Sequence, residues 1–464
     1  MKHVKLIGTA MAGLALAGCT VGPNYKRPQV AVPDQFRNAN VAAKESLADQ
    51  KWSEVFRDEQ LTQLVSKSLE HNFDLRIAAE RILEARAQVG IVRAGQLPAV
   101  DGTASFTANQ SAGNGASVLA PSQRGASYTT VAPGVSWDLD LWGRLRRLSE
   151  AARAQYAASQ EGRRALTVSL IGDVMDAYFG LLEQDLELTL SGRAQAAAED
   201  GLRLTKLRRE RGAATGLDVA QAEQLLYTAT SQVPGIRRNI GLYEDQLSLL
   251  AGEAPQAVAR TAKLEDVPLP PELPAGLPAD LLARRPDIRQ AEQGLIAANA
   301  EIGAARALLF PEVTLTGFFG VQSRALGSLL DSVAHEGRIT PAALQPIFHA
   351  GIRSGIQLTE AQQREALLNY QKTIYTALRD VSDALVNHDQ LRAQRIEEEK
   401  LVAALAATVN MANLRYRGGL DSYLQVLDAQ RNLFLGQLTL ARLRLSEVQA
   451  IVELYRALGG GWQP

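Results

Sequence analysis

The chain has 464 residues, a formal net charge of −1 at pH 7 and a single cysteine. A nearly neutral chain carries no signal for binding polyanions, so we expect no nucleic-acid partner. Charged residues make up 21% of the sequence, which is too few for an intrinsically disordered protein. The length allows two or three domains, and one cysteine leaves no partner for a disulfide bond within the chain.

Residues 1–18 have the features of an export signal, with a basic start and an apolar core over residues 6–17 that is too short to span a bilayer. The core ends in Leu16-Ala17-Gly18-Cys19, which resembles the bacterial lipobox. This resemblance implies that Cys19 is diacylated and becomes the mature N-terminus. Thr20 in place of aspartate implies, by resemblance to known lipoproteins, a lipid anchor in the bacterial outer membrane. The alternative is an ordinary secretory signal followed by a chance cysteine.

The next elements follow in chain order. Residues 19–57 are rich in proline and read as an extended, lipidated linker. A helix is expected over residues 61–96, and alternating apolar and polar residues predict strands at 98–110 and 126–139. A proline-free run over 141–209 predicts a very long helix, and a second helix over 217–250 should return beside it with a kink at Pro234.

This pattern is then repeated. Residues 72–106 align without gaps on residues 285–319, and 12 of the 35 aligned positions are identical, which indicates a duplicated unit. Two more strands are expected at 311–322 and 338–346. The predicted organisation is therefore a signal (1–18), a linker (19–57), a first repeat (58–250), a proline-rich linker (251–280), a second repeat (281–458) and a tail (459–464).

The second hairpin is the longest predicted element. Residues 359–416 contain neither glycine nor proline, and a helix of that length spans roughly 87 Å. Its turn, Arg417-Gly418, aligns on Arg211-Gly212 of the first hairpin if one residue is inserted before Leu424. We therefore expect a mainly α-helical fold with long helical hairpins and four strands per chain.

Four strands are too few to close a membrane barrel, since the smallest barrels have about eight. Open strand edges are not tolerated in lipid, so several chains must contribute to one barrel. Counting strands allows a trimer and excludes a barrel made by one chain. Trp137 and Trp142 would lie where strands meet helices, either in an aromatic belt or in the core.

Two stretches carry a resemblance to a known family. Residues 20–28, Thr-Val-Gly-Pro-Asn-Tyr-Lys-Arg-Pro, look like the start of mature efflux lipoproteins, and residues 415–431 resemble the periplasmic tip motif of the same family. The chain is thus similar to TolC/OprM-type outer membrane efflux lipoproteins of the NodT-like subgroup. The resemblance implies a homotrimer with a 12-stranded barrel and an α-barrel tunnel. It further implies a periplasmic adaptor and an inner membrane transporter of the resistance-nodulation-division type as partners.

The resemblance also implies a gate at the tip of the second hairpin. Leu424 and Asp428 stand four residues apart, so three copies would give an apolar ring next to a carboxylate ring. Arg415 and Tyr416 could bond to a neighbouring helix and hold the closed state. The alternative is that Asp428 pairs with Arg431 on the surface and that Leu424 belongs to a coiled-coil core.

The two turns are candidate adaptor contacts, through Arg211 and Gly212 in the first hairpin and Arg417 and Gly418 in the second. Simple helix capping is the other interpretation. No catalytic or metal-binding motif is present, so we expect no enzyme and no cofactor beyond the lipid on Cys19. Two other functions stay open, a duct for type I protein secretion and a lipid-anchored coiled-coil scaffold in the periplasm.

Overall fold

The computed structural model describes residues 20–37, 46–108, 127–270, 273–324, 326–329, 331 and 335–460. The expected export signal and Cys19 lie outside these residues. The chain divides into two compact units, and both draw on both halves of the sequence. Unit 1 comprises Met1–Gln29, Arg81–Ser159 and Gln290–Tyr370, and unit 2 comprises Val30–Glu80, Gln160–Arg289 and Gln371–Pro464.

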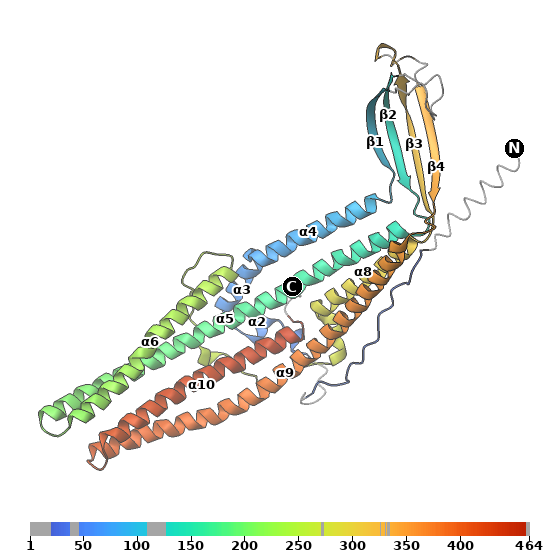
Figure 1. Ribbon diagram of the computed structural model, residues 1–464. Helices are drawn as coiled ribbons and strands as arrows, with labels where there is room; N and C mark the ends of the chain where they lie inside the picture. Colours follow the sequence, from blue (N-terminus) through green and yellow to red (C-terminus); the bar gives the residue numbers. More distant parts are fainter. Residues whose placement is uncertain are drawn as a thin grey trace. The chain divides into compact units, whose positions relative to one another are not determined.

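Unit 1 contains one four-stranded sheet (Figure 1). Its strands are β1 (Ala99–Ala108), β2 (Ser127–Asp138), β3 (Glu312–Ser323) and β4 (His335–Leu344), in the order β1-β2-β3-β4 and antiparallel throughout. The fourth strand lies earlier than the expected 338–346. It ends at Leu344, two residues before Pro346, which has no N–H to donate to a strand partner.

The register places most apolar side chains of this sheet on one face and most polar ones on the other, with Phe318 and Leu344 as apolar exceptions on the polar face. Ala104 faces Val131, which faces Val321, and Trp137 faces Leu315. Alternation along each strand then places two sets of side chains on opposite faces. The apolar face carries Val100, Phe106, Val131, Val135, Trp137, Val313, Leu315, Phe319, Val321 and Ile339, and the polar face carries Asp101, Thr103, Ser105, Thr130, Ser136, Thr316, Gln322, Glu336, Arg338 and Thr340.

The duplication is visible in where the elements begin. Helix α4 (Phe73–Ala94) and helix α8 (Pro286–Ala307) start 213 residues apart, and so do β1, at residue 99, and β3, at residue 312. In unit 1, α8 packs closely on the first part of α5 (Arg144–Glu210) through alanines of both helices, Ala151, Ala154, Ala297 and Ala300. Small side chains allow the two helix backbones to approach each other.

The two tryptophans have different environments. Trp142 stacks on Phe310, with ring centroids 4.8 Å apart, and donates to the carbonyl oxygen of Pro311. Trp137 lies on the apolar face of the sheet with 37% of its surface exposed and donates to the carbonyl oxygen of Gln96. Trp142 is therefore partly buried and packed on Phe310, whereas Trp137 is exposed on the sheet, and the aromatic belt stays a prediction.

The expected single helix over 61–96 is wrong, because it is two helices. Helix α3 (Glu59–His71) ends at Asn72, and α4 begins at the next residue. The buried Asn72 side chain accepts a hydrogen bond from the backbone N–H of Leu75 and donates to the carbonyl oxygen of Leu250. An asparagine side chain thus satisfies backbone groups at a helix break, which a search for glycine and proline does not detect.

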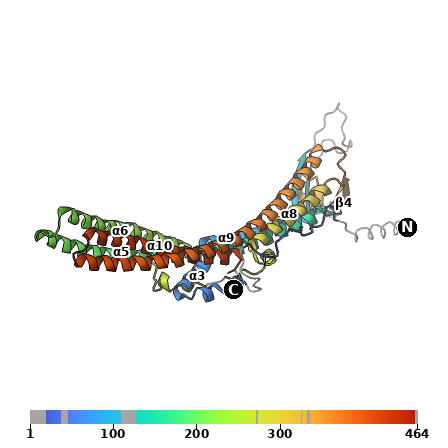
Figure 2. The ribbon, with the colours of Figure 1, turned by 90° about the horizontal axis from the view of Figure 1, so that it is seen from below.

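Unit 2 contains two long helical hairpins that lie side by side in both views (Figures 1 and 2). The first hairpin is formed by α5, from residue 160 onward, and α6 (Gly216–Leu250). The second is formed by α9 (Ala350–Arg417), from residue 371 onward, and α10 (Tyr423–Ala457). The shorter helices of the chain are η1 (Leu47–Asp49), α2 (Trp52–Val55), η3 (Leu264–Asp266), η4 (Pro278–Asp280), α7 (Leu281–Arg284) and η5 (Leu326–Ser328). Among the described residues, only α5 is long and apolar enough to cross a membrane, and 67% of its apolar window is buried, as in a core helix.

The glycines inside α5 do not break the helix. A β-carbon at Gly180 would lie 2.6 Å from Cζ of Tyr243, and one at Gly201 would overlap the hydroxyl oxygen of Tyr423. These positions let bulky rings from α6 and α10 approach the α5 backbone, so the helix-weakening glycines are matched by close packing.

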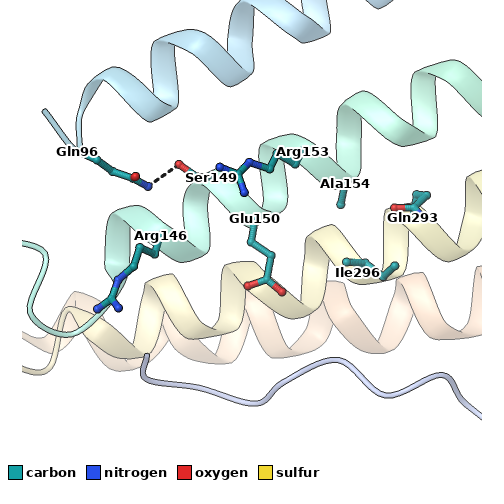
Figure 3. A pocket seen from close by; sticks show the side chains of 8 residues that line it. All are labelled: Gln96, Arg146, Ser149, Glu150, Arg153, Ala154, Gln293 and Ile296. Atoms are coloured by element: carbon teal, nitrogen blue, oxygen red, sulfur yellow. Dashed lines mark hydrogen bonds between the residues drawn. The ribbon is translucent and has the colours of Figure 1, made fainter. Parts of the chain in front are cut away.

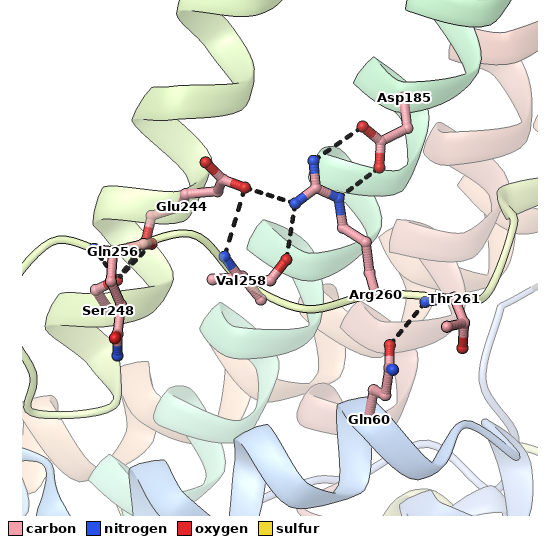
Figure 4. Close-up of polar contacts among 8 residues, drawn as sticks. All are labelled: Gln60, Asp185, Glu244, Ser248, Gln256, Val258, Arg260 and Thr261. Carbon is pink, nitrogen blue, oxygen red and sulfur yellow. Dashed lines mark hydrogen bonds and ion pairs between the residues drawn. The ribbon is translucent and has the colours of Figure 1, made fainter.

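The linker after α6 is fastened to both helices of the first hairpin (Figure 4). Arg260 forms ion pairs with Asp185 on α5 and with Glu244 on α6, both at 2.5 Å, and donates to the carbonyl oxygen of Val258. The two carboxylates raise the pKa of Arg260 above its usual value. The linker is thereby an ordered part of unit 2.

Candidate functional site

The two hairpins end in the same backbone motif. In the first, Gly212 has a φ of 76° and the N–H of Ala213 bonds to the carbonyl oxygen of Arg208. In the second, Gly419 has a φ of 70° and the N–H of Leu420 bonds to the carbonyl oxygen of Arg415. Each is a Schellman turn with glycine in the left-handed position.

This geometry corrects the expected alignment of the turns. Gly212 is equivalent to Gly419, not to Gly418, so Arg211-Gly212 does not match Arg417-Gly418 and no insertion is needed before Leu424. The sequence alignment matched two Arg-Gly pairs, but the backbone selects the glycine that has a positive φ. All four expected contact residues, Arg211, Gly212, Arg417 and Gly418, are exposed at the tips.

Apolar side chains from all four helices hold the two tips together. The cluster contains Leu202, Val219, Ala222, Ala412, Tyr423, Val426, Leu427 and Ala429. Tyr423 is 7% exposed and lies against Gly201, and its burial raises the pKa of its hydroxyl. The two tips are thus fixed to each other by a packed apolar cluster, and the exposed side chains of the turns lie outside this cluster.

Arg415 and Tyr416 make contacts within the same chain. Both oxygens of the Asp421 carboxylate accept from Arg415, and this hydrogen bonding lowers the pKa of Asp421. The Tyr416 ring lies 4.9 Å from the Tyr423 ring, and Cζ of Arg208 on α5 lies 4.4 Å from its centroid. Tyr416 therefore reaches the neighbouring hairpin, whereas Arg415 braces its own turn.

Leu424 and Asp428 lie on one exposed face of α10. Leu424 is 47% exposed, so it is not part of a coiled-coil core in this chain. The Asp428 carboxylate accepts from Arg431 at 2.5 Å and from Asn432 at 3.2 Å. Both side chains are therefore exposed to solvent in a single chain. The pairing of Asp428 with Arg431 is the one expected if Asp428 forms a surface ion pair.

Sequence reasoning did not find how the segment after Cys19 docks in unit 1. We call residues 20–27 the N-terminal strap. The N–H of Val21 donates to the carbonyl oxygen of Trp142, 3.0 Å away. Arg147 on α5 is 3% exposed and donates to the carbonyl oxygens of Val21 and Gly22 and to the Asn24 side chain. Arg147 also pairs with Glu150 on α5 at 2.8 Å, so the strap supplies three of the partners of a buried cation and Glu150 supplies its negative charge.

Helix α8 supplies the other side of this docking groove. Asn299 donates to the carbonyl oxygen of Pro23, and Glu292 accepts from Tyr25 and forms an ion pair with Arg27. A β-carbon at Gly303 would lie 2.7 Å from the carbonyl oxygen of Val21, so only glycine fits beneath the strap. The signal missed in the sequence was Gly303 itself, which the repeat alignment contained.

A cleft of about 510 Å³ in unit 1 lies between α8, the start of α5 and the segment after α4 (Figure 3). Gln96 donates to Ser149 at 2.7 Å, and Arg146 and Arg153 also line the cleft. The lining holds no nucleophile–base pair. Among the described residues no group of three or more His, Cys, Asp or Glu side chains is placed to bind a metal ion.

Comparison with known proteins identifies the family. The family described as "Outer membrane efflux protein" matches residues 64–253 and 277–460, one match for each repeat. The chain is 36% identical to the probable efflux pump outer membrane protein TtgC of Pseudomonas putida, over 98% of this chain and 96% of that protein. It is 34% identical to the cation efflux system protein CusC of Escherichia coli over the full length of both.

Solved structures agree with this assignment. A crystal structure of the open state of the Neisseria gonorrhoeae MtrE outer membrane channel superposes with a TM-score of 0.86 at 30% identity and covers 96% of this chain and 99% of that one. A CusC structure gives a TM-score of 0.85 at 32% identity, covering 96% and 100%. The chain belongs to the outer membrane efflux protein family, and it is an outer membrane efflux channel rather than an enzyme.

Proposed function

We propose that this chain is the trimeric, gated exit duct of a tripartite efflux pump. The observation that carries the proposal is the sheet of unit 1, which has one exposed, mainly apolar face and, among the described residues, no strand paired with either edge. Phe106, Phe319 and Ile339 on that face are 69%, 65% and 78% exposed, which suits contact with lipid. The polar face then suits a water-filled lumen.

The edges call for further copies of the chain. Among the described residues, β1 and β4 each pair with one strand only. Unpaired backbone groups cost several kcal/mol each in lipid, so β4 of one copy pairs with β1 of the next until the barrel closes. Three copies supply twelve strands, and their six hairpins form an α-helical tunnel into the periplasm.

The duct needs partners that supply energy. In our proposal a periplasmic adaptor and an inner membrane transporter of the resistance-nodulation-division type complete the pump. Relatives are described as toluene, solvent and antibiotic efflux proteins and as a cation efflux protein. This range supports efflux of toxic compounds by the present chain without selecting one substrate class.

The gate lies at the tips in this proposal. Three copies of Leu424 form an apolar ring and three copies of Asp428 form a carboxylate ring. Two contacts keep the turn in the shape that aims these side chains. Tyr416 packs on Arg208 and Tyr423, and Arg415 pairs with Asp421.

Single-channel recording of the purified protein in planar bilayers tests the duct. A duct gives discrete conductance steps and prefers cations because of the Asp428 ring. A lipid-anchored scaffold gives no steps at all, and this result would refute the proposal.

We propose that Cys19 carries the lipid anchor. The strap supports this, because Val21 is bonded to Trp142 in the segment between the sheet and α5, so the start of the mature chain is fastened next to the sheet that we propose to be in the membrane. Mass spectrometry of the mature N-terminus should find a modified Cys19 as the first residue. An unmodified Cys19 or another cleavage site contradicts the prediction.

The two turns are the proposed adaptor contacts, with Arg211 and Gly212 in one and Arg417 and Gly418 in the other. The backbone equivalence gives matched positions for crosslinking, Ala213 and Leu420. Cysteines placed at either position should crosslink to the adaptor in cells. Cysteines at Glu199 and Thr408, exposed farther along the same hairpins, should crosslink much less. Equal crosslinking at all four positions would mean that the turns have no special contact.

A further inference from the structure

The middle of α5 carries two carboxyl side chains that are buried within a single chain. Glu183 is 3% exposed and Glu187 is 5% exposed. They are four residues apart and therefore lie one turn apart on the same helix face. The cation found beside them among the described residues is Arg442 of α10, whose Nε lies 2.8 Å from Oε1 of Glu187. Two buried carboxylates thus face one guanidinium.

The other neighbours do not supply a second positive charge. Gln184 donates to Glu183 and accepts from Asn239 of α6. Tyr243 of α6 packs against the α5 backbone at Gly180. Within the part of the chain that the structure describes, Oε1 of Glu183 has no hydrogen-bond partner. A buried carboxylate oxygen without a partner is costly, so this site lacks a proton donor.

Nearby carboxylates on α5 have their own cations. Asp176 is paired with Arg456 of α10 at 3.3 Å, and Asp185 is paired with Arg260 of the linker. Neither cation is available to Glu183. Arg456 also faces Asp173 and Glu453, and burial raises the pKa of Asp176 to about 6, so Asp176 is a second titrating carboxyl group on α5, separate from the Glu183–Glu187 pair.

We propose that Glu183 and Glu187 form a proton-binding site, in which one proton taken from solvent is shared between the two carboxyl groups and keeps α5 packed against α6 and α10. The proton sits on one carboxyl oxygen and is donated to the other carboxylate. The pair then carries one negative charge, which Arg442 balances. When the proton leaves, two carboxylates repel each other beside one guanidinium and this contact weakens. The site is complete in one chain and does not depend on the proposed function.

The direction of the pH effect follows from burial. The pKa of Glu183 is raised from 4.5 to about 7, mainly by burial and to a smaller extent by the negative charge of Glu187. Because the pKa is higher in the folded than in the unfolded protein, the stabilisation is present at low pH and is lost as the pH rises toward and through about 7. The thermal unfolding midpoint should therefore fall between about pH 4.5 and about pH 7 and change little above that range.

Infrared spectroscopy of the purified full-length protein detects the proton directly. The wild type should show the carbonyl stretch of a protonated carboxylic acid below neutral pH, and this band should disappear above it. Glu183→Gln should remove the part of the band that titrates near pH 7, reduce the fall of the unfolding midpoint over that range, and raise the midpoint at the alkaline end, whereas the part that titrates near pH 6, from Asp176, should persist. The exposed Glu199→Gln on the same helix is the matched control and should leave both signals at wild-type values.

Glu187→Gln is the second variant, and it keeps the test decisive if Glu183→Gln does not fold. It leaves one carboxylate beside Arg442, so it should also remove the part of the band that titrates near pH 7 and reduce the pH dependence. A purely structural role for Glu183 would lower the midpoint equally at every pH. That result, or a protonated-acid band near pH 7 that survives in both variants, overturns the proposal.

Discussion

Replacing Leu424 and Asp428 by alanine is expected to increase the conductance of the channel severalfold and to reduce its preference for cations. Leu424→Ala widens the apolar ring and lets it wet, and Asp428→Ala removes the carboxylate ring and the partner of Arg431. Each single variant should show its own part of the effect. The measurement is single-channel recording in planar bilayers, with antibiotic sensitivity of cells as a second readout.

The first hairpin supplies matched controls for these variants. Leu217 and Gln221 occupy the positions equivalent to Leu424 and Asp428, and Leu217 is likewise exposed. Leu217→Ala and Gln221→Ala should change conductance and ion preference much less, because that helix has no charge at the second position. If the second-hairpin variants keep wild-type conductance and ion preference, the constriction lies elsewhere.

Gly303→Ala is expected to release the N-terminal strap. The new β-carbon would lie 2.7 Å from the carbonyl oxygen of Val21 and 2.9 Å from the Arg147 side chain. Overpacking of this kind costs roughly 1–3 kcal/mol, which shifts the equilibrium between the docked and the released strap by about fivefold to more than a hundredfold. Trypsin should then cut after Lys26 much faster than in the wild type, whereas cutting after Arg27 is blocked by the proline that follows.

Two alanine variants are controls for the strap. Gly294 lies on the same helix, Gly90 is the repeat equivalent of Gly303, and a β-carbon at either position meets no atom within 4 Å. Both variants should be cut at the wild-type rate. If trypsin cuts after Lys26 at the same rate in the wild type, in Gly303→Ala and in both control variants, the strap is not held by the groove. Arg147→Met, which removes the buried cation, should release the strap as strongly as Gly303→Ala.

How much the sequence predicts differs between the fold and the site. The duplicated helix–strand pattern was predictable, because Gly90 and Gly303 fall at corresponding places in α4 and α8. The break at Asn72 was missed because its cause is a side chain bonded to Leu250, far away in the sequence. The one-residue shift at the tips was missed because only backbone geometry separates Gly418 from Gly419.

The partners of buried polar groups were beyond prediction from the sequence. Arg147 resembles any other basic residue of a solvated helix until the strap, more than a hundred residues earlier, is placed on it. Glu183 and Glu187 likewise resemble surface residues until α6 and α10 pack against α5 and Arg442 pairs with Glu187. Such pairs depend on contacts between distant segments, and residue spacing within one helix carries no information about them.

Native mass spectrometry of the protein in mild detergent tests the central claim most directly. The unpaired edges of β1 and β4 require other copies of the chain, so the account predicts a complex of three chains that each carry the lipid on Cys19. A stable monomer or dimer under conditions that keep the sheet folded would contradict it, because four or eight strands with open edges do not make the proposed barrel.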